Sequence, residues 1–115
     1  MAVYNGAYPV LPDKVDTARA FAAAVAGPRR AEFEKLQRKV KTTRETWTFQ
    51  EMPGGGGLML VWFECEDVEA ALAHSMTDTS EFGRWFVAQV QEATGLDMSE
   101  PPEGPLPEVV LDWSA

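Results

Sequence analysis

The residues that could do chemistry in this sequence are few, and proton transfer is the reaction that they suggest. His74 is the only histidine, and imidazole is the side chain whose unperturbed pKa lies near neutrality. Asn5 could orient a ligand carbonyl or dioxygen. Glu64 would act as a general base if its side of the strand faced the interior, because burial raises the pKa of a carboxyl group. We take these three as catalytic candidates, although each also fits an ordinary polar position at a helix edge or on a strand.

Aromatic side chains could contact an apolar ligand. Tyr4, Trp47, Trp62 and Trp85 are the candidates for ligand binding. Each also falls on a strand or helix stripe that a core would need to fill, so packing is the competing interpretation. Cys65 has no flanking cation in the sequence and is expected to be a packed apolar thiol.

Several classes of site are excluded. With one cysteine and one histidine, a single chain has no disulfide framework and no multi-histidine or multi-cysteine metal site. The glycine run 54–57 lacks the lysine and the following helix of a phosphate-binding loop. This run is therefore expected to be a flexible hairpin connection. We predict no metal and no cofactor.

Charge is distributed unevenly along the chain. Residues 1–44 contain nine Lys/Arg and four Asp/Glu, whereas residues 45–115 contain one Arg and fourteen Asp/Glu. The basic cluster within 28–44 fits either a helix that docks on an acidic group or a solvated helix surface held by i,i+4 ion pairs. The acidic remainder would repel nucleic acid, so no nucleic-acid partner is expected.

Membrane and targeting signals are not apparent. No stretch approaches the roughly 20 consecutive apolar residues that a membrane span needs. The first residues have no basic patch followed by an apolar run, so we expect no signal peptide and no membrane partner. A cytoplasmic location is the default expectation.

Periodicity predicts six elements within one domain, residues 1–115. A strand is predicted over 2–10, and a helix over about 13–41 that is capped by Asp13 and broken at Gly27-Pro28. Alternation predicts strands over 43–52 and 58–63. A second broken helix has two segments, which are capped by Asp67 and Ser80, and the second segment ends at Gly95. A last strand is predicted over 108–113.

This order predicts a ferredoxin-like α+β fold, β-α-β-β-α-β, with a four-stranded antiparallel sheet and the helices on one face. The strand 58–63 reads Leu-Met-Leu-Val-Trp-Phe, so both of its faces should be buried. Leaving one apolar row in water would forgo roughly 1.5–3 kcal/mol for each large side chain. A second copy is the simplest cover, and we expect a homodimer whose sheets pack face to face.

The element order, the strand 58–63 and the closing helix "SEFGRWFVAQVQEATG" resemble the dimeric α/β-barrel superfamily over nearly the whole chain. That superfamily includes antibiotic-biosynthesis monooxygenases and stress-responsive barrel proteins. The resemblance implies a pocket between sheet and helices, bordered by the first strand. Haem-degrading members use an asparagine on the first strand with a tryptophan and a histidine on the second helix. Asn5 and His74 match two of these, but Trp62 lies on a strand and Trp85 follows His74, so haem chemistry is not expected.

Two functions remain open. One is a protein that binds a hydrophobic or aromatic small molecule, with the cofactor-independent monooxygenase-like activity that the resemblance implies. The alternative is a non-catalytic dimeric interaction module that uses the basic helix 28–44. An open cavity touching His74 would favour the first function, and a filled interior would favour the second.

Overall fold

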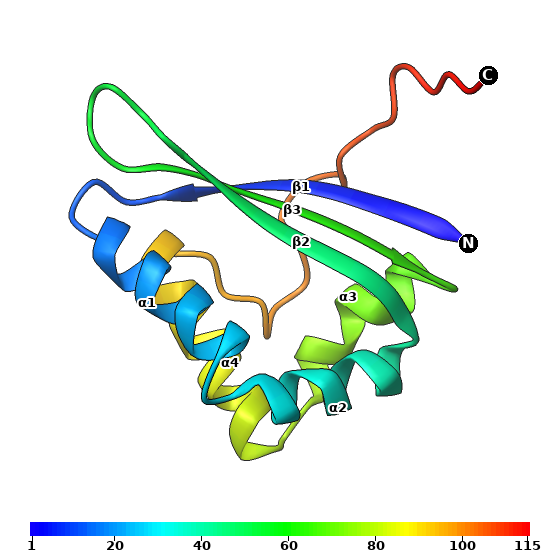
Figure 1. Cartoon of the computed structure of the whole chain (residues 1–115), viewed down its shortest axis with the longest axis horizontal. Helices are drawn as coiled ribbons and strands as arrows, with labels where there is room; N and C mark the ends of the chain where they lie inside the picture. Colours follow the sequence, from blue (N-terminus) through cyan, green and yellow to red (C-terminus); the bar gives the residue numbers. More distant parts are fainter.

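Three strands form one antiparallel sheet in the computed structural model, which describes all 115 residues. The strands are β1 (Ala2–Val10), β2 (Thr42–Glu51) and β3 (Gly57–Cys65). The central strand is β3, in the order β1-β3-β2. The four helices are α1 (Val15–Ala26), α2 (Arg30–Val40), α3 (Val68–Thr77) and α4 (Glu81–Thr94). All four lie on one face of the sheet, which we call the inner face (Figure 1).

Alternation along each strand separates the inner face from the opposite, outer face. In β1 the inner positions Tyr4, Gly6 and Val10 are buried and Tyr8 is half-buried, whereas the residues that alternate with them are exposed. In β3 the inner row is Met59, Val61 and Phe63, whereas the outer row is Leu58, Leu60 and Trp62. Leu60 remains 39% exposed on the outer face, so within one chain the outer row is only partly covered.

The predicted helix boundaries are confirmed at four places. The helical region breaks at Gly27-Pro28 into α1 and α2. The Asp67 carboxylate accepts from the backbone N–H of Ala70, and the Ser80 hydroxyl accepts from that of Gly83. Gly95 ends α4 in the left-handed conformation at φ 81°, which glycine adopts without strain. The predicted cap at Asp13 is wrong, because α1 begins at Val15 and Lys14 precedes it without a side-chain cap.

The predicted ferredoxin-like fold with four strands, β-α-β-β-α-β, is wrong. Residues 101–115 run extended and pair with no strand, so the sheet has three strands and the strand predicted over 108–113 is absent. Val109, Val110, Leu111 and Trp113 are 68–86% exposed. Alternation in sequence shows that a segment could have an apolar face, but a strand also needs a neighbour for its backbone hydrogen bonds. The segment ends on the outer-face side of the sheet (Figure 1).

None of the four helices combines the length and the apolar character that crossing a lipid bilayer demands.

Candidate functional site

A cavity lies between the inner face of the sheet and the helices. Its volume is about 140 Å³, and 18 of its 26 lining residues are hydrophobic. An apolar cavity of about 150 Å³ is large enough for benzene, so this one fits a ligand of about one ring. No Lys or Arg lines it, whereas the carboxylates of Glu45 and Asp78 both do.

Aromatic rings form one wall of the cavity. Trp47, on the inner face of β2, lies 5.2 Å from Phe21, 6.0 Å from Phe33 and 5.8 Å from Phe86 between ring centroids. These rings come from β2, α1, α2 and α4. Trp47 meets the three phenylalanines edge to face or tilted, whereas Phe33 and Phe86 are stacked. The aromatic wall therefore joins the sheet to three of the helices and fixes the position of the Trp47 indole.

Glu45 is the polar centre of this wall. Its carboxylate accepts a hydrogen bond from Trp47 Nε1 at 2.5 Å and another from Gln37 Nε2 at 2.8 Å. Burial raises the pKa of Glu45, although these two hydrogen bonds act in the opposite direction. None of the ion pairs in the protein involves Glu45. The cavity wall thus holds a carboxyl group without a cationic partner.

Two tyrosines supply a second polar group. The Tyr4 and Tyr8 hydroxyls lie 2.7 Å apart and share a hydrogen bond. The Tyr4 ring folds over Gly6, where an added Cβ would lie 2.4 Å from the Tyr4 hydroxyl oxygen. Burial, followed by the hydrogen bond with Tyr4, raises the pKa of Tyr8. Tyr8 lines the cavity, whereas Tyr4 does not line it and contacts the Tyr8 hydroxyl.

His74 lines the cavity from α3, as the sequence hypothesis required of a ligand-contacting imidazole. Its Nε2 is buried without a hydrogen-bond partner and lies 3.4 Å from Asp78 Oδ2. Burial acts to raise the pKa of Asp78, but the hydrogen bonds from Ser80 and the nearby His74 lower it overall. His74 and Asp78, four residues apart, thus form a third polar group in the cavity wall.

The seven predicted site residues do not converge on one place. His74 and Trp47 line the cavity, and Tyr4 reaches it through Tyr8. The Trp85 ring packs on the core side of α4, under the Arg29 guanidinium at 4.4 Å.

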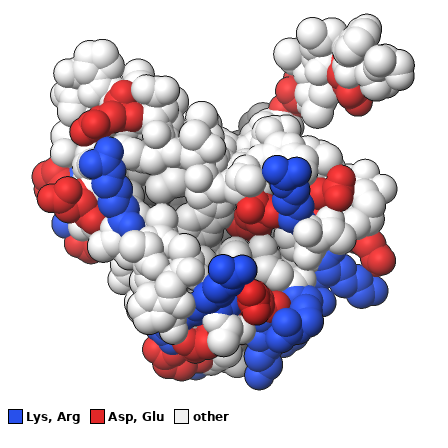
Figure 2. Space-filling view, in the orientation of Figure 1, with Lys and Arg blue, Asp and Glu red and all other residues white.

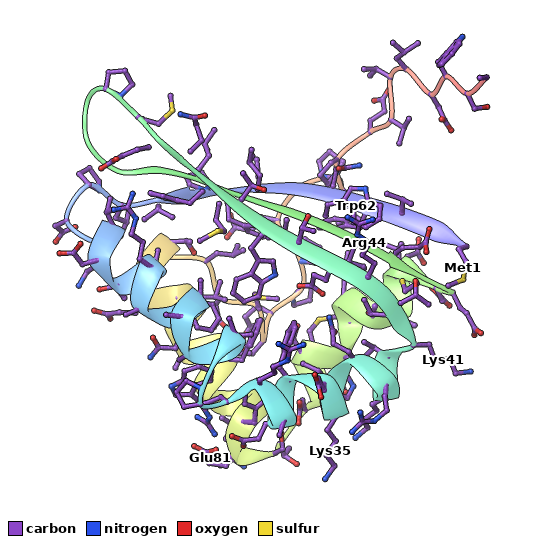
Figure 3. The ribbon with its side chains drawn as sticks, viewed as in Figure 1. Met1, Lys35, Lys41, Arg44, Trp62 and Glu81 are labelled. Carbon is purple, nitrogen blue, oxygen red and sulfur yellow. The ribbon has the colours of Figure 1, made fainter.

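Asn5, Trp62 and Glu64 lie on the outer face and do not border the cavity. Glu64 accepts a hydrogen bond from Thr43 Oγ1 at 2.8 Å. The Arg44 guanidinium lies 5.8 Å from the centre of the Trp62 ring, and Figure 3 labels both residues on the sheet. The row that contains Glu64 therefore faces away from the helices.

Sequence reasoning missed Glu45, Gln37 and Tyr8. For Glu45 a signal was present: it lies two residues before Trp47 and so falls in the apolar row of the 43–52 alternation. A charged residue is unusual in a strand row that otherwise faces the core. This position could therefore have identified Glu45 as a candidate site residue. Cys65 is fully buried and burial raises the pKa of its thiol, which agrees with the expected packed cysteine.

Comparison of this chain with protein-family models, curated proteins and solved structures finds no match. The resemblance to dimeric α/β-barrel proteins therefore stays a prediction, and the function must be argued from the chain's own residues.

Proposed function

We propose that this protein binds a small, ring-containing apolar molecule in the cavity between the sheet and the helices. The observation that supports this most is the apolar cavity of about 140 Å³ with His74 and Trp47 in its wall. Ligand pockets are mostly apolar with a few placed polar groups, and here those groups are Glu45, Tyr8 and His74. The His74 Nε2 makes no hydrogen bond within the chain, so a ligand hydroxyl or carbonyl that reached it would satisfy it.

The proposal is one of binding. Of the three side chains predicted to act chemically, only His74 borders the cavity, because Asn5 and Glu64 lie on the other face of the sheet. The monooxygenase-like activity implied by the resemblance would need other residues than those.

Calorimetry with toluene and benzyl alcohol tests the proposal. We expect both compounds to bind with one site per chain, because each is about as large as the cavity. Ala71 lines the cavity from α3, and Ala71→Leu should fill part of it and weaken binding about tenfold or more. Ala70→Leu is the matched control, since Ala70 is exposed on the same helix. Equal binding by the two variants, in folded protein, would show that these ligands bind elsewhere.

The alternative function, an interaction module that uses the basic helix 28–44, has less support. Arg29 pairs with Glu32 and Glu81, Arg30 with Glu34, and Lys41 with Glu66. In Figure 2 acidic atoms lie among the basic ones over α2, and in Figure 3 Lys35 and Lys41 point away from the body of the molecule. The cluster thus has the ion pairs expected of a solvated helix surface.

We also propose that the outer face is a contact between two copies of this chain. Two apolar surfaces of the same chain are uncovered. One is on the outer face of the sheet, with Leu60 on β3 and Val3 on β1, opposite Glu64. The other is residues 109–113 of the C-terminal segment. The segment lies on the outer-face side of the sheet (Figure 1). In a two-fold symmetric dimer, the C-terminal segment of each copy would pack against the outer face of the other copy.

Sedimentation of the purified full chain at micromolar concentration tests this second proposal. We expect a dimer, and we expect Leu60→Glu to convert it to a monomer because the substitution would bury a carboxylate at the contact. Leu96→Glu is the control, since Leu96 is similarly exposed but follows α4. A monomeric wild-type chain, or a dimer that Leu60→Glu leaves intact, would rule out this contact.

A further inference from the structure

We infer that the preferred ligand of the cavity is a primary amine on an aromatic or similarly apolar ring, with its ammonium group bound by the Glu45 carboxylate. The inference rests on the proposed function and adds the chemical class of the ligand.

The first argument is the charge of the cavity wall. Its 26 lining residues contain the carboxylates of Glu45 and Asp78 and no Lys or Arg. Asp78 has His74 beside it at 3.4 Å and a hydrogen bond from the backbone N–H of Ser80. Glu45 has no cationic neighbour. Glu45 is half-buried. Carboxylates that are withdrawn from water are normally paired, so the partner that Glu45 lacks would have to come from outside the chain.

The second argument is the capacity of Glu45 to accept more hydrogen bonds. An ionised carboxylate offers about four acceptor positions. Two are used, one by Trp47 Nε1 and one by Gln37 Nε2. These donors also hold the carboxylate in place, so a ligand would not have to order it. An ammonium group can fill the remaining positions, since it carries three donors and no acceptor.

The third argument is the aromatic surface next to the carboxylate. The Trp47 indole is in direct contact with Glu45 and with the rings of Phe33 and Phe86 in the cavity wall. Aromatic faces attract ammonium groups. A carboxylate beside aromatic rings therefore favours a cation over a neutral alcohol, and disfavours an acid by like-charge repulsion.

Four ring compounds of similar size separate these possibilities: toluene, benzyl alcohol, benzylamine and benzoate. At neutral pH we expect benzylamine to bind wild-type protein about tenfold or more tightly than benzyl alcohol, because hydrogen bonds between charged groups are about twice as strong as neutral ones. Benzoate should bind more weakly than benzyl alcohol. Each affinity is measured by calorimetry on the full chain.

Glu45→Gln should remove the preference for benzylamine while changing the affinity for benzyl alcohol less than about threefold. Glu64→Gln is the matched control, because Glu64 lies on the outer face of the same sheet. Should Glu45→Gln fail to fold, the ranking of the four compounds by wild-type protein still decides the matter.

The outcomes distinguish this inference from the proposed function. Binding of toluene and benzyl alcohol without a preference for benzylamine overturns the inference and leaves the cavity function standing. A preference that survives in Glu45→Gln but is lost in Asp78→Asn overturns the assignment to Glu45. Failure of all four compounds to bind overturns both.

Discussion

Glu45 is the residue on which the electrostatics of the cavity depends. Its carboxyl group lies among aromatic side chains, with two donors from the protein and no cation. Such a group is costly to keep ionised in a low-dielectric surrounding, and its raised pKa expresses that cost. Carboxyl groups with a perturbed pKa beside a cavity are candidates for contact with a ligand.

The raised pKa of Glu45 predicts a pH dependence of stability. In the unfolded chain this carboxyl group has a pKa of 4.5, and folding raises it. Protonation therefore favours the folded state: the stabilisation is complete below pH 4.5 and is lost as the pH rises through the folded pKa. Glu45→Gln removes this titration. Hence the free energy of unfolding of the wild type, minus that of Glu45→Gln, should fall as the pH rises from 4.5 to neutrality.

Urea unfolding of both proteins at several pH values measures this difference, in which the other titrating groups largely cancel. A difference that stays constant across the range, or that grows with pH, would mean that folding does not raise the pKa of Glu45.

Which side of each strand faces the cavity could not be predicted at every residue. In 43–52 the alternation assigns Trp47 and Phe49 to the core correctly, because the other row is polar. In 58–63 both rows are apolar, so the pattern gave no reason to choose between them. Glu64 was a candidate only if its row faced inward, and it faces outward. The inward carboxylate is Glu45, one strand away.

At the scale of elements, local signals were sufficient wherever one residue controls a boundary. Asp67, Ser80 and Gly95 end or begin helices for reasons of hydrogen bonding and backbone geometry that are visible in the sequence. The C-terminal segment differs, because a strand depends on a neighbour that the sequence does not name. The α+β character was therefore predictable, whereas the number of strands was not.

The cap at Ser80 predicts a local loss of stability. Ser80→Ala removes the acceptor for the Gly83 backbone N–H at the start of α4, and should lower the free energy of unfolding by about 0.5–2 kcal/mol. Thr79→Ala is the control, since Thr79 is exposed and precedes the cap. Both variants are compared by urea unfolding. If Ser80→Ala were as stable as Thr79→Ala, this cap would not stabilise α4.

At the scale of the whole molecule, the sheet has two uses. Its inner face forms one wall of a cavity that all four helices help to line. Its outer face has a partly covered apolar row, and an exposed apolar segment lies on the same side of the sheet. A pocket between sheet and helices was expected only because the resemblance to dimeric α/β-barrel proteins implied one. The exposed segment could not be predicted, because only the folded arrangement shows which apolar residues remain without contacts.

The central claim is that ligands enter the inner cavity, and the four tryptophans test it directly. Trp47 lines the cavity, Trp62 lies on the outer face, Trp85 packs beneath Arg29, and Trp113 is in the exposed segment. Each indole N–H gives its own signal in a ¹⁵N–¹H spectrum, assigned through single Trp→Phe variants. On titration with benzyl alcohol we predict that the Trp47 signal shifts and that the Trp62 and Trp113 signals stay in place. Movement of the Trp62 or Trp113 signal while that of Trp47 stays fixed would contradict the account.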